Sequence, residues 1–332
     1  MMKILNSSDI SITDWQHLVD QSDNRSFFQT KACYDFYCQL SFLKPFLYAV
    51  SENNHLKALV CGYIVADGGI LKSYFSRRAI VPGGVLLDRS VSEAALDLLL
   101  NTLKKELSKQ VIYIEIRNYT NYGSFRSCFE KNEFTYQSHL NFHVKTSDAD
   151  SVFKQLSASK RRQIKQTGKF GVRCIETTDI SDVHMLYDIL KGLHKTKIKT
   201  PVFPVEFFEK LLQGSFAKLF VVKDKTTVLG GIMCVMLPGK VMYEWFVCGE
   251  EMPETNVYPS TLATWTAIKY AAENDYQYFD FMGAGKPDED YGVRDFKAKF
   301  GGKLVEHGRF LYICNNFLYA IGKITIQTKR KF

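Results

Sequence analysis

The chain has 332 residues, of which 46% are hydrophobic and 23% are charged, with a formal net charge of +8 and a pI of about 8.9. This is the composition of an ordinary soluble globular protein, and no apolar run approaches the roughly 18 residues of a membrane-spanning helix. The moderately basic charge permits an anionic partner such as RNA, a phosphate-rich substrate or a membrane surface, without requiring one.

The cysteine pattern and the N-terminus indicate a reducing compartment. Eight cysteines are scattered without a C-x-x-C pair, which argues for buried reduced thiols and against a zinc site. The first residues, MMKILNSSDI, lack the apolar segment of a signal peptide. We therefore expect a cytoplasmic protein without a metal.

The first half of the chain alternates helical and strand patterns. Apolar spacing predicts short helices over 12–19, 32–40 and 125–131, and a longer amphipathic helix over 93–107 with lysines opposite its leucines. Strands are predicted over 46–50, 56–65, 111–116 and 139–144, the first two joined by the polar turn 51–54.

The second half repeats this order. A hairpin around 223–225 corresponds to the one around 51–54, helix 260–272 to helix 93–107, and strands 278–281 and 308–313 to strands 113–116 and 139–144. The offset stays near about 170 residues, the span of one domain. We expect two α+β domains of one plan, at 1–147 and 148–314, the second carrying the active site, followed by a basic amphipathic tail at 315–332.

A dense basic segment, SASKRRQIKQTGKFGV, lies between the two halves at 157–172. A serine can cap a helix here and a glycine can end it. Lys160, Arg161, Arg162 and Lys165 are expected to share one basic face, and guanidinium and ammonium groups suit phosphate oxygens. The alternative is a solvated linker helix.

The stretch Tyr278 to Gly302, YFDFMGAGKPDEDYGVRDFKAKFGG, has the strongest signature of a site. A strand runs into a Gly283-Ala284-Gly285 turn, where backbone can approach a ligand closely. A short helix follows, with Phe296 and Phe300 on one face and Lys297 between them. The alternative is a loop with a solvated lysine.

The tail ends in Lys329-Arg330-Lys331 after an apolar helical face that includes Phe317 and Ile321. This pattern suits peripheral association with a membrane surface. It equally suits a helix packed on its own domain.

Taken together, these stretches resemble the FemABX family of peptidoglycan interpeptide-bridge aminoacyltransferases. The resemblance covers most of the chain and is strongest at KRRQIKQTGKFGV, FDFMGAG and GVRDFKAKFGG, and weaker at SFFQTKACYDFY and RAIVPGGVLLD. It implies two tandem GNAT-like (acyl-CoA N-acyltransferase-like) domains, each a mixed, mostly antiparallel sheet flanked by helices.

The resemblance also implies roles for single residues. Lys297 takes the place of the lysine of the family's FK signature, where an ammonium assists acyl transfer by stabilising charge that develops on the ester carbonyl. Arg162 matches a basic position that grips the diphosphate of the cell-wall precursor, and Phe296 would wall the substrate channel. Asp280, before the glycine turn, is expected to be a structural hydrogen-bond acceptor.

Four further residues are candidate substrate contacts because of where they lie in the sequence. Arg161 and Lys165 are neighbours of Arg162 in the basic segment. Tyr243 lies on the long strand predicted over 241–247, and Gly283 in the turn after strand 278–281.

The implied reaction transfers an aminoacyl group from aminoacyl-tRNA to an amine of a peptidoglycan precursor, which is either free or lipid-linked. It needs no tightly bound cofactor, and it would occur in the cytoplasm or at the inner face of the membrane. One alternative is an N-acyltransferase that takes its acyl group from acetyl-CoA and acts on an envelope polysaccharide or amine. Another is a non-catalytic protein that binds RNA or a precursor.

Two local patterns bear on these alternatives. Enzymes that use acyl-CoA cradle its pyrophosphate on a glycine-rich turn at a helix N-terminus. The corresponding stretch 250–262 has no glycine and carries three acidic residues, which would repel a pyrophosphate. His139 and His143 would share one strand face with Asn141, as a metal site without an evident third ligand or as a solvated sheet face.

Overall fold

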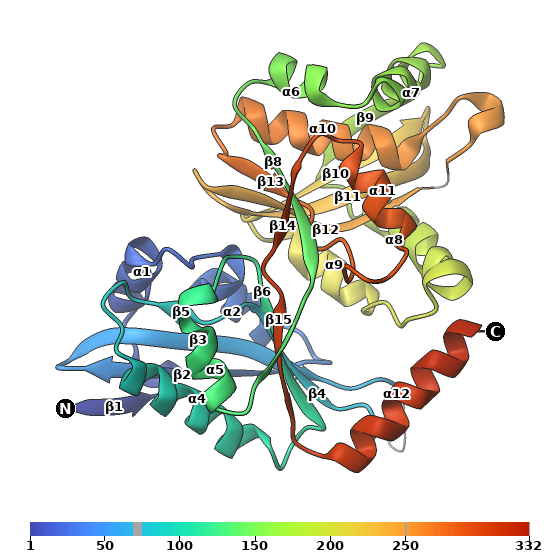
Figure 1. Cartoon of the computed structure of the whole chain (residues 1–332). Helices are drawn as coiled ribbons and strands as arrows, with labels where there is room; N and C mark the ends of the chain where they lie inside the picture. The colour runs from blue at the N-terminus through green and yellow to red at the C-terminus, as the bar shows by residue number, and fades with distance from the viewer. Residues whose placement is uncertain (69–74, 250, 332) are drawn as a thin grey trace. The chain divides into compact units, whose positions relative to one another are not determined.

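The computed structural model describes residues 1–68, 75–249 and 251–331, the side chains of 253 and 324–331 excepted. The chain forms two compact units (Figure 1). Unit 1 comprises Met1–Ser138 and His307–Phe332, and unit 2 comprises His139–Glu306.

Unit 1 contains a mixed sheet in the order β1-β2-β3-β4-β6-β15-β7, with β5 paired to β3. Strands β4 and β6 run parallel, and the other pairs are antiparallel. The strands are β1 (Met2–Leu5), β2 (Lys44–Glu52), β3 (His55–Val65), β4 (Arg78–Gly83), β5 (Leu86–Leu87), β6 (Tyr113–Asn118), β7 (Thr135–Gln137) and β15 (Arg309–Ile313).

Helices cover both faces of this sheet. The leucines of α4 pack on one face together with Phe129 of α5, and Trp15 and Leu18 of α1 pack on the other. Ser92 caps α4 by accepting a hydrogen bond from the amide of Ala95. The helices are α1 (Ile12–Gln21), α2 (Lys31–Cys38), α4 (Glu93–Leu107), α5 (Arg126–Lys131) and α12 (Asn316–Lys331).

Unit 2 contains a sheet in the order β14-β8-β13-β12-β11-β10-β9. Strands β12 and β13 run parallel, and the other pairs are antiparallel. The strands are β8 (Leu140–Lys145), β9 (Arg173–Thr177), β10 (Ala217–Asp224), β11 (Thr227–Leu237), β12 (Val241–Gly249), β13 (Tyr278–Asp280) and β14 (Lys303–Glu306).

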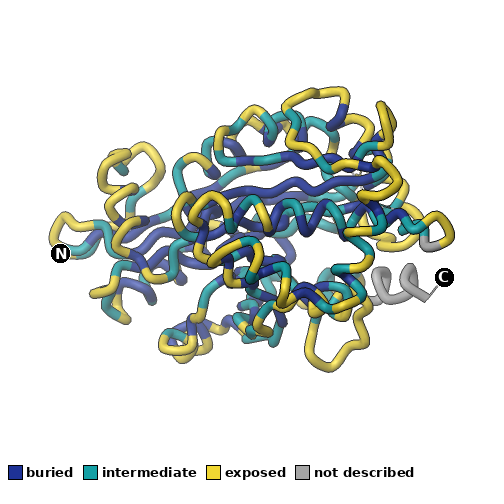
Figure 2. Tube along the Cα trace, turned by 90° about the horizontal axis from the view of Figure 1, so that it is seen from above, coloured by how far each residue is buried: buried dark blue, intermediate teal, exposed yellow. Residues whose placement is uncertain are grey.

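In unit 2, α10 lies across one face of the sheet with α6 and α7 beside it, and α8 and α9 lie on the other face (Figure 1). The central strands of both sheets are largely buried, whereas edge strands such as β9 and β14 and many loops are exposed (Figure 2). The helices are α6 (Ala149–Gln155), α7 (Ala158–Lys169), α8 (Ile180–Leu193), α9 (Val205–Leu212), α10 (Pro259–Glu273) and α11 (Gly292–Ala298).

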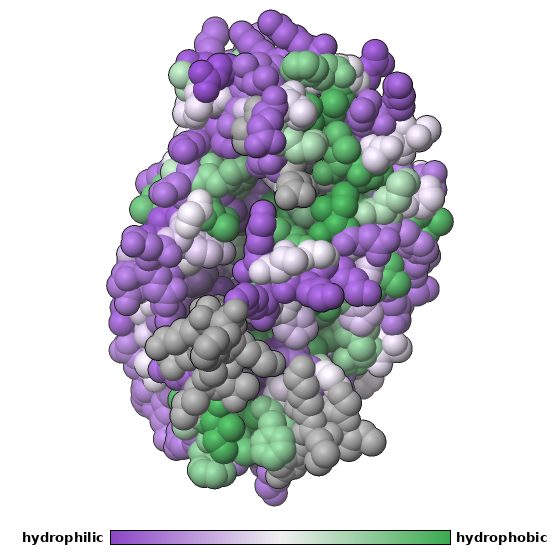
Figure 3. Space-filling model, turned by 90° about the vertical axis from the view of Figure 1, so that its right-hand side faces the viewer, coloured by the Kyte–Doolittle hydropathy of each residue, from purple (hydrophilic) through white to green (hydrophobic). Residues whose placement is uncertain are grey.

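The face in Figure 3 is mostly hydrophilic, with hydrophobic side chains gathered in patches. Over the residues that the structure describes, no helix is long and apolar enough to cross a membrane.

The prediction of two α+β domains with mixed, mostly antiparallel sheets is confirmed, but the units differ from the expected ranges. Strand β8, expected within 1–147, pairs with β13 and β14 of the second sheet. Strand β15, expected within 148–314, pairs with β6 and β7 of the first sheet, and α12 also belongs to unit 1. The repeat in the sequence orders the strands but does not specify which sheet each one joins.

Strand β15 is therefore essential to the core of unit 1. Phe310 is 1% exposed, and its ring stacks on Phe129 with centroids 4.0 Å apart. It also packs edge-on against Tyr136 at 5.5 Å.

We expect Phe310→Ala to lower the free energy of unfolding of unit 1 by about 3–5 kcal/mol, because a buried aromatic is replaced by a cavity. Urea denaturation of the full chain measures this loss.

Phe317→Ala is the matched control, because Phe317 is 73% exposed a few residues further along the same segment. Its effect should stay within about 0.5 kcal/mol. Equal stability of Phe310→Ala and the parent protein would mean that unit 1 folds without β15.

Candidate active site

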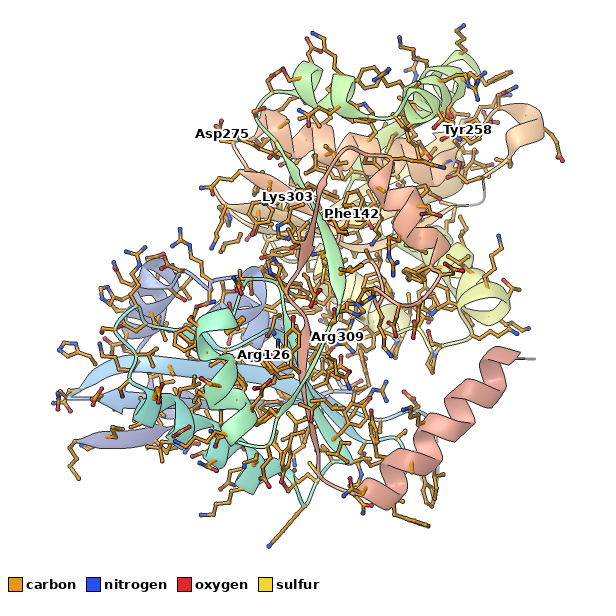
Figure 4. The ribbon with its side chains drawn as sticks, in the orientation of Figure 1. Arg126, Phe142, Tyr258, Asp275, Lys303 and Arg309 are labelled. Carbon is orange, nitrogen blue, oxygen red and sulfur yellow. The ribbon has the colours of Figure 1, made fainter. Side chains whose placement is uncertain are left out.

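The centre of unit 2 has a point at which two parallel strands part. Strands β12 and β13 pair only over Val241–Tyr243 and Tyr278–Asp280, although β12 continues to Gly249. After Asp280 the chain leaves β12 but stays bonded to β8, since the amide of Phe281 donates to Phe142 O at 3.1 Å. Figure 4 labels Phe142 on β8 and Lys303 on the neighbouring β14. The carboxyl ends of parallel strands that diverge are common ligand sites in open sheets.

Lys297 of α11 reaches into this point and is only 8% exposed. Its ammonium donates to the carbonyl oxygens of Phe281 at 2.6 Å and Gly283 at 2.9 Å. The carboxylate of Glu244 lies 3.1 Å away. Because an ammonium has three N–H donors, these three acceptors satisfy Lys297 completely.

Glu244 is the counter-ion of Lys297 and projects from the middle of β12, where it is 3% exposed. Burial raises the pKa of its carboxyl, while the Lys297 ammonium and the Thr264 hydroxyl favour the charged form. Thr264 of α10 lies 3.5 Å from the second carboxylate oxygen. The pair therefore joins β12, α10 and α11.

The turn after β13 is also fixed from the side of β8. Asp280 is fully buried and accepts hydrogen bonds from the amide of Met282 at 2.6 Å and the side-chain amide of Asn141 at 2.7 Å. Asn141 in turn accepts from the amide of Gly283 at 2.8 Å, and His143 Nε2 lies 3.0 Å from Asp280. Met282 and Gly283 have φ of 57° and 138°, so these bonds hold a backbone that glycine adopts more readily than other residues.

This network bears on two expectations from the sequence. Asp280 is a structural hydrogen-bond acceptor, as expected. His143 and Asn141 serve the turn, and within the described residues there is no group of three or more His, Cys, Asp and Glu side chains that could hold a metal ion.

The basic face expected on α7 is divided by the fold. Arg162 and Lys165 are exposed, whereas the guanidinium of Arg161 donates to the carbonyls of Lys154 and Leu156, both at 2.6 Å, and caps the end of α6. The expectation that Lys160 shares the face is wrong, since Lys160 is 5% exposed and points inward. Its aliphatic stem enters the core because α7 packs against α10 on this side.

Lys160 links α7 to the first turn of α10 and to α11. Its ammonium donates to the Thr261 hydroxyl at 2.7 Å and lies 3.8 Å from the centre of the Phe296 ring. Phe296 in turn packs against Phe300 with the two rings tilted and their centroids 5.3 Å apart. Burial lowers the pKa of Lys160 to about 8, against the opposing effect of Glu251.

The first turn of α10 binds a carboxylate from the preceding loop of the same chain, that of Glu251. Glu251 accepts hydrogen bonds from the amide of Thr261 at 3.2 Å and from its hydroxyl at 3.4 Å. Burial raises the pKa of Glu251, and the charge of Lys160 opposes this rise. A helix N-terminus attracts anions, and here that position is taken by Glu251. Glu250, part of the same acidic stretch, lies outside the described residues.

The fold brings three of the predicted site residues together: Lys297, Phe296 and Gly283. Tyr243 is nearby on β12, in register with Asp280, but it is fully buried. The exposed Arg162 and Lys165 lie on α7, which contacts this cluster through Lys160 and the Phe296 ring.

Glu244, Thr264 and Glu251 are members of the site that were not predicted from the sequence. One signal was present: Glu244 is the charged residue within the apolar run VMYEWFV. A charge in a strand that is buried on both faces requires a partner, and Lys297 supplies it.

Comparisons with known proteins agree with this fold. Residues 151–297 match the family model "Acetyltransferase (GNAT) domain", which ends at Lys297. The solved structure of FemX is similar over 96% of this chain and 99% of that one, with a TM-score of 0.70 and 14% identity. No curated protein sequence matches the chain.

Two further solved structures share the fold. One is the C-terminal domain of a putative lysylphosphatidylglycerol synthetase from Agrobacterium fabrum, with a TM-score of 0.60, 12% identity and 95% of both chains covered. The other is a tandem GNAT protein from the clavulanic acid biosynthesis pathway, with a TM-score of 0.57, 9% identity, and 95% of this chain and 99% of that one covered. The fold is that of tandem GNAT proteins, and the family match supports an acyltransferase of the GNAT type.

The buried Lys160 gives a prediction for pH dependence. Its pKa of about 8 in the folded protein lies below the value of about 10.4 for a free lysine. Between these values the unfolded chain binds more protons, so this group makes the protein more stable as pH rises from 8 towards about 10.4. Below pH 8 the folded protein bears the full free-energy cost of burying the charged ammonium of Lys160.

Lys160→Met removes this titration. The unfolding free energy of the parent protein should therefore rise relative to that of Lys160→Met across this pH range, as measured by urea denaturation at each pH. Lys169→Met, at an exposed position of the same helix, is the matched control for the loss of a lysine charge. A difference between Lys160→Met and the parent that stays constant across this pH range would contradict the lowered pKa.

Proposed function

We propose that the protein transfers an aminoacyl group from aminoacyl-tRNA to an amine of a peptidoglycan precursor. The observation that carries the proposal is the buried cluster of Lys297, Glu244 and the turn after β13 within the acetyltransferase-type domain. Two of the motifs that resemble the FemABX family, FDFMGAG and GVRDFKAKFGG, meet at this cluster, and the FemX structure has the same fold over nearly the whole chain.

The choice of donor rests on the first turn of α10. In an acyl-CoA enzyme this turn would receive a pyrophosphate. Here the Glu251 carboxylate accepts a hydrogen bond from the Thr261 amide, and its negative charge would repel a pyrophosphate. This contact supports aminoacyl-tRNA over acetyl-CoA as the donor. Because aminoacyl-tRNA is a cytoplasmic donor, we propose that the reaction takes place in the cytoplasm or at the inner face of the membrane.

The exposed basic side chains of α7 supply a place for the acceptor. Arg162 and Lys165 face solvent and suit the phosphate oxygens of a cell-wall precursor, whether it is free or lipid-linked. Arg161 would act indirectly, since its hydrogen bonds to Lys154 and Leu156 fix the joint between α6 and α7.

In the proposed reaction the amine nitrogen of the acceptor attacks the ester carbonyl of the aminoacyl group. A C–N bond forms, the bond from the carbonyl carbon to the ribose oxygen breaks, and the proton lost by the amine ends on the leaving oxygen. Lys297 would stabilise the negative charge on the carbonyl oxygen by donating a hydrogen bond to that oxygen. The N–H group that would do so now faces Glu244, which is the most distant of the three acceptors of Lys297. Phe296 would form one wall of the channel.

We expect Lys297→Ala to lower turnover by about 100-fold or more with little change in substrate affinity, as for loss of an oxyanion donor. The substitution also leaves Glu244 buried without its cation, at a cost of about 3–5 kcal/mol in stability. The double variant Glu244→Gln/Lys297→Met removes both charges, so its turnover can be compared with that of the parent while both proteins are folded. Single-turnover assays with charged tRNA measure the rate.

Lys299→Ala is the matched control, because Lys299 is an exposed lysine two positions further along the chain. It should keep the turnover of the parent protein. Parental turnover in the folded double variant would remove Lys297 from the mechanism.

A direct titration tests the donor. Purified protein is titrated with acetyl-CoA, with aminoacyl-tRNA and with uncharged tRNA at one stated salt concentration, because RNA binding depends on salt. We expect saturable binding that favours charged tRNA and no binding of acetyl-CoA. Tight acetyl-CoA binding would contradict the proposal and identify an acyl-CoA N-acyltransferase. Equal binding of both tRNAs without turnover would indicate a binding protein.

A further inference from the structure

The C-terminal helix α12 exposes hydrophobic side chains. Phe317 is 73% exposed and Ile321 is 39% exposed. They lie one turn apart on the same side of the helix, since residues four positions apart are neighbours on a helix surface. Figure 3 shows hydrophobic surface at the lower end of the molecule, where α12 begins in Figure 1.

The start of α12 is fixed to unit 1 in a way that leaves Phe317 outside. Tyr319 packs edge-on against Tyr113 of β6, with ring centroids 5.5 Å apart. The side chain of Asn315 accepts a hydrogen bond from the amide of Leu318 at 3.0 Å. The helix is thus anchored through the side that carries Tyr319, and Phe317 faces water at a cost that burial elsewhere would remove.

The charge of this segment has one sign. From His307 to the end of the chain there is no aspartate or glutamate, and the helix carries Lys323, Lys329, Arg330 and Lys331. In sequence, Ile324 continues the spacing of Phe317 and Ile321. A basic helix with an aromatic and aliphatic stripe has the chemistry of an interfacial helix on an anionic lipid surface.

The length of α12 favours a position on such a surface. At 1.5 Å per residue its 16 residues extend about 24 Å, which is short of the roughly 30 Å hydrocarbon core of a bilayer. A second copy of the chain is a poorer occupant, because a two-fold interface would bring two helices of the same positive charge together.

We propose that α12 docks the protein on an anionic membrane surface, with Phe317 and Ile321 inserted at the headgroup boundary and the net positive charge of the tail attracted to lipid phosphates. This docking does not depend on which acyl group the enzyme transfers.

The test is co-sedimentation of the full-length protein with vesicles. One set contains phosphatidylcholine alone, and the other contains equal parts of phosphatidylcholine and phosphatidylglycerol. We expect binding to the anionic vesicles that weakens with added salt. The variant Lys329→Gln/Arg330→Gln/Lys331→Gln should lower the partition coefficient by about 100-fold, or about fivefold for each charge. Phe317→Ser should lower it by about tenfold or more.

Matched controls come from unit 2. Phe170 is 57% exposed, so Phe170→Ser removes a similar apolar side chain elsewhere. Lys195→Gln/Lys197→Gln/Lys199→Gln removes three exposed charges from another basic run. Both variants should bind vesicles as the parent protein does.

Each other outcome decides against the proposal. Equal binding to both vesicle types, no binding, or equal losses in the control and test variants would overturn it. A Phe317→Ser variant that changes a dimer to a monomer in size-exclusion chromatography, without a change in vesicle binding, would assign this face to a second copy instead.

Discussion

The structure of the candidate site depends on one buried cation. The Lys297 ammonium needs three acceptors because it is largely shielded from water, and it finds them in Glu244 and the carbonyls of Phe281 and Gly283. Those carbonyls face Lys297 only because the chain turns away from β12 directly after Asp280. The need to satisfy one ammonium therefore couples the end of β13, the position of α11 and the charge on β12.

Helix α10 takes part in the networks of two buried lysines, each through one of two fully buried threonines. Thr264 contacts Glu244, the partner of Lys297, and Thr261 contacts both Lys160 and Glu251. The two lysines differ in their partners. Lys297 has a carboxylate at 3.1 Å, whereas Lys160 has a hydroxyl and an aromatic ring, which solvate a charge less well. Burial lowers the pKa of Lys160, and the charge of Glu251 opposes that shift only in part.

Much of the fold could be predicted from the sequence because it depends on local patterns. The leucine spacing of α4, the serine cap and length of α7, and the strand and glycine turn before α11 were all evident from residue spacing. The nearness of Lys297 to the turn was also predictable, since a short helix after a tight turn can go only a short distance. The inward direction of Lys160 was not predictable, because it depends on which side of α7 packs against α10.

Residue spacing alone was enough to predict the order of the elements, their repetition, and the grouping of Gly283, Phe296 and Lys297. Which sheet each strand joins depends instead on the folded arrangement. Strands β8 and β15 hold corresponding places in the two halves, yet each is paired with strands of the other half. Either strand presents a similar alternation of apolar side chains, so the pattern is compatible with both sheets. The choice follows from contacts between residues far apart in sequence, such as Phe310 with Phe129 and Asn141 with Asp280.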